Sequence, residues 1–109
     1  MSADHDVVQR QADAYNAHDL DGFVATYSPD VVVRDLAGVR GSGHAWLRDT
    51  YGPMFEGGSP PAAIRGRVSA GNWVVDEELV IGSRRGDIHV LVGYRLVDGL
   101  IVEVLFFEP

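Results

Sequence analysis

The sequence contains no cysteine, which excludes disulfide bonds, thiolate nucleophiles and thiolate metal ligands together. Basic residues are scarce as well. Nine of them against sixteen acidic residues give a net charge of −7, so no broad electropositive surface is expected to bind nucleic acid or anionic lipid. No apolar run approaches the ~20 residues of a membrane span, and the first ten residues contain no apolar signal core. We therefore expect a soluble cytoplasmic protein without nucleic-acid or membrane partners.

Motifs for metals and phosphates are also missing. The four histidines share no short ligand spacing, so the sequence predicts neither a metal site nor a cofactor. The turn 41–43 (Gly-Ser-Gly) could receive an anion on its backbone N–H groups, but without a P-loop lysine it is interpreted as a helix cap. A hydrophobic content of 46% over 109 residues indicates one globular domain, residues 1–109.

The first half of the chain is predicted to be helical. One helix is expected from about Ser2 to residue 17, a short one from Asp19 to a stop at Pro29, and a third from Ser42 to an end near residues 52–53. The residues in phase along these helices are Val8, Gln11 and Tyr15, then Leu20, Phe23, Val24 and Tyr27, then Trp46, Leu47 and Tyr51.

The second half has the period of β-strands. Strands are expected at residues 64–70, 73–82, 88–96 and 100–107, the last two joined by a tight turn at Asp98 and Gly99, with one earlier strand at 31–36. Because helices precede most of the strands, the predicted fold class is α+β.

The last strand is apolar on both sides. Ile101, Leu105 and Phe107 alternate with Val102, Val104 and Phe106. In a small antiparallel sheet one face normally meets water, so the second apolar face predicts a partner, most simply a homodimer through the sheet.

Three polar residues interrupt apolar faces, and each has a functional and a structural interpretation. Asp35 continues the face of Val31 and Val33, yet it also precedes a turn whose backbone it could bind. Gln11 lies within the helical stripe or is solvated at its edge. Glu77 belongs to the acidic run 76–78 and is functional only if its strand face is the concave one.

Three segments carry a resemblance to a known family: VVQRQADAYNAHDLDGFVATYSPDVVVRD, GSGHAWLRDTY and GYRLVDGLIVEVLFF. Together they resemble bacterial ketosteroid isomerases and related SnoaL-like proteins of the nuclear-transport-factor-2-like (NTF2-like) type. The resemblance implies a cone in which three N-terminal helices pack on a curved, mostly antiparallel sheet around an apolar cavity. It also implies dimerisation through the outer face of the sheet.

The resemblance assigns roles to individual residues. It places Asp35 on the family's general base and Tyr51 on a pocket tyrosine, whereas Gln11 and Val92 replace the two donors of the oxyanion hole. It therefore implies a related enolisation, such as cyclisation of a polyketide, rather than true steroid isomerisation. The remaining residues expected to contact the substrate are Tyr15, Tyr27, Trp46, Glu77, Val92, Tyr94 and Phe106.

The leading hypothesis is thus an isomerase- or cyclase-like enzyme that acts on a small apolar carbonyl compound, with Asp35 as base and Gln11 and Tyr51 as carbonyl donors. A non-catalytic domain that binds a small hydrophobic ligand is the alternative, because the usual oxyanion donors are replaced. A protein-interaction module is a third interpretation, based on the last strand.

Overall fold

The computed structural model describes residues 3–109, in which three helices and six strands form one α+β arrangement, as predicted. The helices and strands are α1 (Ala3–Asn16), α2 (Leu20–Val24), β1 (Tyr27–Asp35), β2 (Gly38–Ser42), α3 (Gly43–Glu56), β3 (Ala62–Ala70), β4 (Trp73–Ser83), β5 (Gly86–Val97) and β6 (Leu100–Phe106). No helix within residues 3–109 combines the length and the apolar character needed to cross a membrane.

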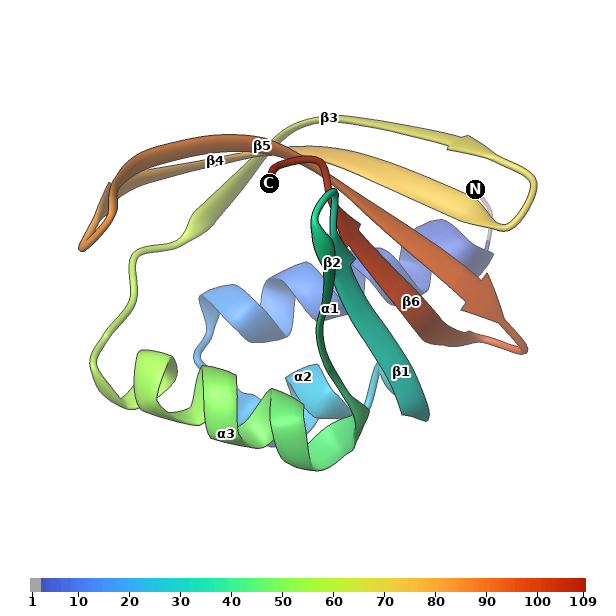
Figure 1. The fold of residues 1–109 in the computed structure, drawn as a ribbon, viewed down its shortest axis with the longest axis horizontal. Coiled ribbons are helices and arrows are strands. Elements are labelled where there is room, and N and C mark those ends of the chain that lie inside the picture. Colours follow the sequence, from blue (N-terminus) through green and yellow to red (C-terminus); the bar gives the residue numbers. More distant parts are fainter. Residues whose placement is uncertain (1–2) are drawn as a thin grey trace.

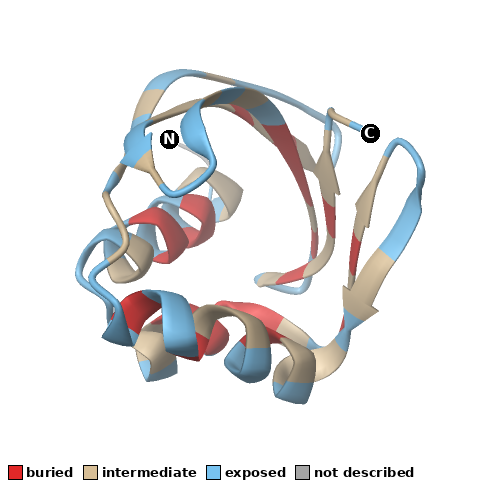
Figure 2. Ribbon diagram, turned by 60° about the vertical axis from the view of Figure 1, so that its left-hand side comes forward, coloured by how far each residue is buried: buried red, intermediate tan, exposed pale blue. Residues whose placement is uncertain are grey.

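The six strands form one curved sheet in the order β2-β1-β6-β5-β4-β3. All neighbours are antiparallel except β1 and β6, which pair in parallel. The sheet bends around the three helices, which cover its concave side (Figure 1). Buried residues of both layers face each other across this space (Figure 2). The concave face is therefore where a site can be enclosed.

The helices differ from the prediction at their ends. The predicted start at Ser2 lies outside the described residues. The second helix ends at Val24 and not at Pro29, because Tyr27 already pairs with Ile101 at the start of β1. The third helix continues through Pro53 to Glu56. Its last turn is held by Phe55, whose ring packs edge-on against Phe23 with centroids 5.6 Å apart.

Strand β2 was not predicted, because its sequence Gly-Val-Arg-Gly-Ser resembles a loop. A Cβ at Gly41 would lie 2.1 Å from Nε1 of Trp46, so the indole ring packs directly on the backbone of β2 and only glycine fits. Ser42 occupies the N-cap position of α3 with extended backbone, but its side chain makes no capping hydrogen bond. Gly41 therefore serves close packing, whereas Gly38 and Gly43 adopt positive φ values of 146° and 84°.

The two faces of β6 do not alternate as predicted. Arg95 pairs with Glu103 while Leu96 pairs with Ile101, so Val102 forms a bulge. As a result Ile101 and Val104 both lie in the core, at 0% and 3% exposure. On the outer face, Trp73 and Phe107 flank Gly93, and Phe107 is 43% exposed. The outer face thus keeps an apolar patch, while the homodimer stays a prediction.

Candidate active site

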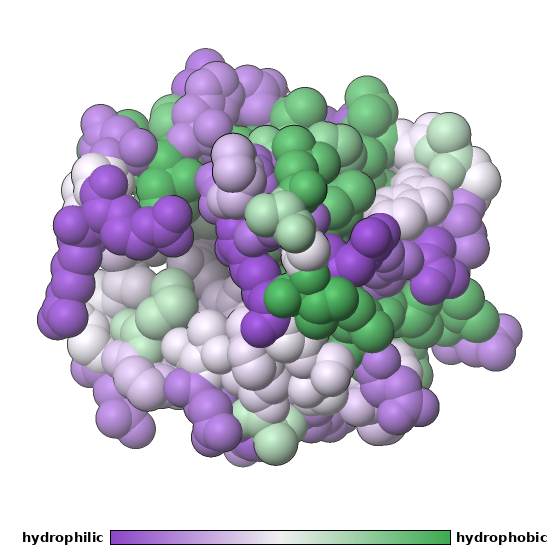
Figure 3. Space-filling view, in the orientation of Figure 1, coloured by the Kyte–Doolittle hydropathy of each residue, from purple (hydrophilic) through white to green (hydrophobic). Residues whose placement is uncertain are grey.

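A cavity of about 260 Å³ lies between the helices and the concave face of the sheet. Figure 3 shows the surface hollowed on the side of the β4–β5 turn, where hydrophilic side chains border the opening. The volume is slightly below the ~300–1,000 Å³ of sites for drug-sized ligands, so the cavity fits a ligand of about one or two rings.

Aromatic side chains form most of the cavity wall. All four tyrosines of the chain line it, and so do Phe23, Trp46 and Phe106. The rings pack on one another, with 4.8 Å between the centroids of Phe23 and Tyr51. The predicted contact residues that line the cavity are Tyr15, Tyr27, Trp46, Tyr94 and Phe106. The helical and strand periodicity therefore indicates correctly that these aromatic side chains line the cavity.

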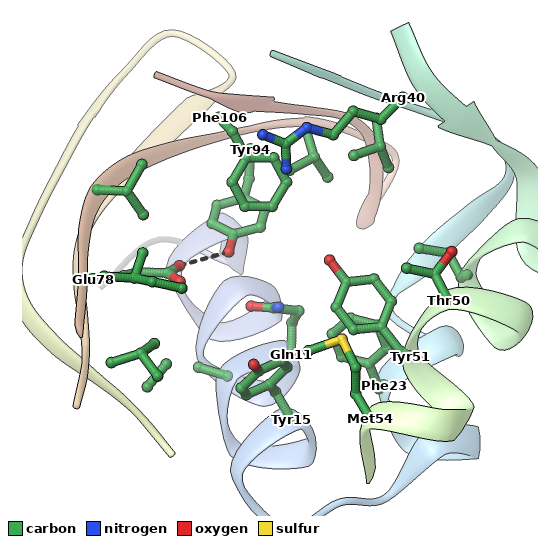
Figure 4. A pocket seen from close by; sticks show the side chains of 18 of the residues that line it. Gln11, Tyr15, Phe23, Arg40, Thr50, Tyr51, Met54, Glu78, Tyr94 and Phe106 are labelled. Atoms are coloured by element: carbon green, nitrogen blue, oxygen red, sulfur yellow. Dashed lines mark hydrogen bonds between the residues drawn. The ribbon is translucent and has the colours of Figure 1, made fainter. Parts of the chain in front are cut away.

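Gln11 on α1 and Tyr51 on α3 both point into the cavity, as predicted (Figure 4). Burial raises the pKa of Tyr27 well above its ordinary value, and a hydrogen bond from Gln11 acts in the opposite direction. Gln11 is thus engaged with a neighbouring tyrosine. In the part of the chain that the structure describes, no side chain hydrogen-bonds to the Tyr51 hydroxyl, which leaves this donor free for a ligand.

Val92 does not line the cavity. Its side chain is fully buried in the core, where β5 pairs it with Asp76 on one side and Phe106 on the other. The prediction that Val92 contacts a substrate is therefore wrong, because Phe106 and Tyr94 form the cavity wall in this region.

The prediction for Glu77 is also wrong. Val74 and Asp76 are buried on the inner face of β4, so Glu77 points outward and Glu78 points into the cavity. On the outer face, Oε2 of Glu77 lies 2.6 Å from Nε2 of His89. The carboxyl of the run 76–78 that lines the cavity is therefore the one that sequence reasoning did not select.

Glu78 is a partly buried carboxyl in an aromatic environment. Its Oε2 accepts a hydrogen bond of 2.8 Å from the Tyr94 hydroxyl (Figure 4). Burial raises the pKa of Glu78 from its ordinary 4.5 to about 7, while the Tyr94 hydrogen bond opposes this rise. A carboxyl with this pKa exists in both protonation states near neutral pH, which is what general acid–base chemistry requires.

Asp76, two residues earlier on the same face, is fully buried but already paired. Arg67 donates to both of its oxygens, at 2.6 and 2.9 Å, and a third hydrogen bond of 2.9 Å joins Arg67 to Gln9. This bidentate ion pair provides hydrogen-bond donors for both oxygens of Asp76. The Asp76 carboxylate does not line the cavity. Asp76 therefore supports the wall behind Glu78.

Asp35 lies at the end of β1 and not on the cavity wall. Its Oδ1 accepts hydrogen bonds from the N–H groups of Ala37 and Gly38, and its Oδ2 accepts one of 2.8 Å from Nε of Arg40. The Arg40 guanidinium and these backbone donors hold the pKa of Asp35 below its usual range. The expected location among apolar walls is therefore wrong, and the turn interpretation matches the structure.

Within residues 3–109, no group of three or more histidine or acidic side chains is placed to hold a metal ion. The polar groups that the cavity offers are the Glu78 carboxyl with its raised pKa, several hydroxyl groups, the Gln11 amide, and the charged side chains of Arg40, Arg85 and Glu108.

The SnoaL-like domain family matches residues 8–104, nearly the whole chain. The chain belongs to the SnoaL-like family. The fold of this SnoaL-like domain is also that of solved NTF2-like structures, which confirms the predicted fold. One is an NTF2-like protein from Cytophaga hutchinsonii, with a TM-score of 0.82 and 15% identity over 95% of this chain and 88% of that chain.

Two further structures with this fold have more informative descriptions. A candidate polyketide cyclase from Sinorhizobium meliloti has a TM-score of 0.81 and 20% identity over 93% of both chains. TerC, co-crystallised with polyporic acid, has a TM-score of 0.80 and 19% identity over 99% of this chain and 92% of that chain. At these identities the likeness shows the fold alone. No curated protein matches the SnoaL-like domain described here.

Proposed function

We propose that this SnoaL-like domain is an enzyme of the isomerase or cyclase type, which moves a proton on a small apolar carbonyl compound with Glu78 as the acid–base group. One observation carries the proposal. Glu78 is a carboxyl in an aromatic cavity, and burial raises its pKa to about 7. The candidate polyketide cyclase from Sinorhizobium meliloti supports the choice of reaction class, since it shares the fold.

The arrangement of the cavity suits proton transfer next to a carbonyl group. Glu78 enters from β4, whereas Tyr51 enters from α3 on the other side of the cavity (Figure 4). An ionised Glu78 can take a proton from the carbon beside the carbonyl, while the Tyr51 hydroxyl donates to the carbonyl oxygen of the resulting enolate. Protonated Glu78 then returns the proton to another carbon or to an oxygen, so no other reactant is consumed.

The experiment compares two conservative substitutions. Glu78→Gln keeps the shape and removes the basicity, and Asp35→Asn does the same for the carboxylate outside the cavity. Exchange of α-hydrogens for deuterium in a panel of cyclic ketones, followed by NMR, should be lost in Glu78→Gln. It should be largely kept in Asp35→Asn, because the asparagine oxygen can still accept the hydrogen bond from Arg40. Loss of exchange in Asp35→Asn with normal exchange in Glu78→Gln would overturn the proposal.

A non-catalytic binding domain is the second candidate. It is favoured by the hydrocarbon side chain of Val92, which the resemblance aligns with a donor of the family's oxyanion hole and which is fully buried here. A wild-type protein that binds the ketones, yet exchanges their α-hydrogens no faster than Glu78→Gln does, would establish this alternative.

A further inference from the structure

Arg40 is a charged side chain fixed on the cavity wall. Its Nε donates to Asp35 and its Nη2 to Glu108, both at 2.8 Å, and its Cζ lies 4.4 Å from the centre of the Phe106 ring. A guanidinium that is paired with two carboxylates and stacked on a ring has little freedom to leave this position. It lines the cavity together with Phe106 and Glu108.

Part of this guanidinium is left for a ligand. Arginine has five N–H donors, and the two ion pairs occupy two of its three nitrogens. In the region that the structure describes, Nη1 has no hydrogen-bond acceptor. Burial raises the pKa of Tyr51, and the positive charge of Arg40 acts against that rise, so the two groups share one electrostatic environment.

Figure 4 shows how the polar groups of the cavity are divided. Arg40 and the hydroxyl of Tyr51 approach from β2 and α3, whereas Glu78 and the Tyr94 hydroxyl meet at the sheet wall formed by β4 and β5. The carboxylates of Asp35 and Glu108 balance the charge of Arg40. An oxygen that carries negative charge is therefore held there by hydrogen bonds from Nη1 of Arg40 and from the Tyr51 hydroxyl, whereas an ionised Glu78 repels it. The cavity therefore distinguishes the two ends of a ligand.

We propose that Arg40 determines specificity, and that with Tyr51 it binds the anionic oxygen of acidic enols, so that the preferred substrates are 1,3-dicarbonyl compounds. This inference rests on the proposed function, since it names the substrate class of the same cavity. An enolate oxygen at Arg40 directs the neighbouring carbon atoms toward the Glu78 wall. Asp35, outside the cavity, contributes by holding the guanidinium in place.

The test uses two probes of nearly the same shape. Dimedone is a cyclic 1,3-diketone that is an enolate at neutral pH, and its enol methyl ether is uncharged. Binding is followed by the fluorescence of Trp46, which lines the cavity, and by calorimetry. We expect the wild type to bind the enolate at least about tenfold more tightly than the ether, a lower bound for a hydrogen bond to a charged group.

Three variants separate charge from structure. In Arg40→Met the preference for the enolate should fall to about one, while the affinity for the ether changes less than about threefold, which also shows that the cavity is intact. Arg40→Lys should keep part of the preference. Arg84→Met is the matched control, because Arg84 is exposed on the β4–β5 turn and does not line the cavity, and it should keep the full preference.

Three results would each overturn the inference: equal binding of both probes by the wild type, an unchanged preference in Arg40→Met, or binding of neither probe. All these measurements are made at equilibrium and need no turnover, so they are independent of the deuterium exchange that tests Glu78. A preference that depends on Arg40, with no exchange by the wild type, would reject the proposed reaction and keep the anion site.

Discussion

Glu78→Gln should make the protein more stable at alkaline pH relative to the wild type. The pKa of Glu78 is about 7 in the folded state and 4.5 ordinarily, so the folded state binds the proton more tightly than the unfolded state does. Stability from this group is therefore fully present below pH 4.5 and is lost as the pH rises to about 7. At 1.36 kcal/mol per pKa unit, the loss is about 3 kcal/mol. Glutamine is neutral at every pH, so the Glu78→Gln variant does not lose this stability as the pH rises.

The assay is urea unfolding of both proteins at pH 4.5 and pH 8. Groups such as Asp35 and Glu103, whose pKa values are lowered by arginine partners, change the stability of both proteins alike. The difference between the two proteins therefore isolates Glu78. From pH 4.5 to pH 8, this difference should move by about 3 kcal/mol in favour of the variant. A difference that stays constant within 0.5 kcal/mol, roughly the error of the extrapolation, would refute the raised pKa.

Two further predictions concern assembly and the core. We predict a homodimer through the outer face around Trp73 and Phe107, so light scattering should give about twice 11.9 kDa for the wild type and the single-chain mass for Phe107→Glu. A wild-type mass of one chain at micromolar concentration would contradict this. Arg67→Met should destabilise the fold by about 3–5 kcal/mol, because it leaves the buried Asp76 unpaired; thermal unfolding with a loss below about 1 kcal/mol would count against it.

The sequence predicts the fold and the aromatic wall of the site because both depend on periodicity. Tyr15 and Tyr51 lie on the apolar faces of their helices, and Tyr94 lies on an apolar face of its strand. These faces pack toward the core wherever the helices contact the sheet. The family resemblance places Tyr51 in the pocket independently. Gln11 is found by the same reasoning, as a polar member of a buried stripe at 7% exposure.

The sequence does not predict which carboxyl enters the cavity, because the more apolar face of β4 is the outer one. Trp73, Val75, Leu79 and Ile81 favour the face of Glu77, yet Ile81 is 59% exposed. The inner face is set by pairing of β4 with β5, which joins Glu78 to Val90. Pairing between strands is a tertiary property, and a shift of one residue exchanges the faces.

Two other errors have the same origin in nonlocal structure. The bulge at Val102 cannot be seen in an apolar run that only Glu103 interrupts, although it moves Ile101 into the core. Asp35 has the sequence position of a catalytic base, but its partner Arg40 belongs to the unpredicted strand β2, and Glu108 completes the cluster from the far end of the chain. The alternation of Val31, Val33 and Asp35 in the sequence does not indicate the ion pair between Asp35 and Arg40.

The pH dependence of deuterium exchange tests the role of Glu78 most directly. The ionised carboxylate is the base, so the protein-catalysed exchange rate of a bound cyclic ketone should rise with pH and level off above an apparent pKa of about 7. In Glu78→Gln the exchange rate should equal the rate without protein at every pH. A wild-type profile that rises through pH 4, or one that Glu78→Gln reproduces, would contradict the assignment of Glu78 as the proton-transfer group.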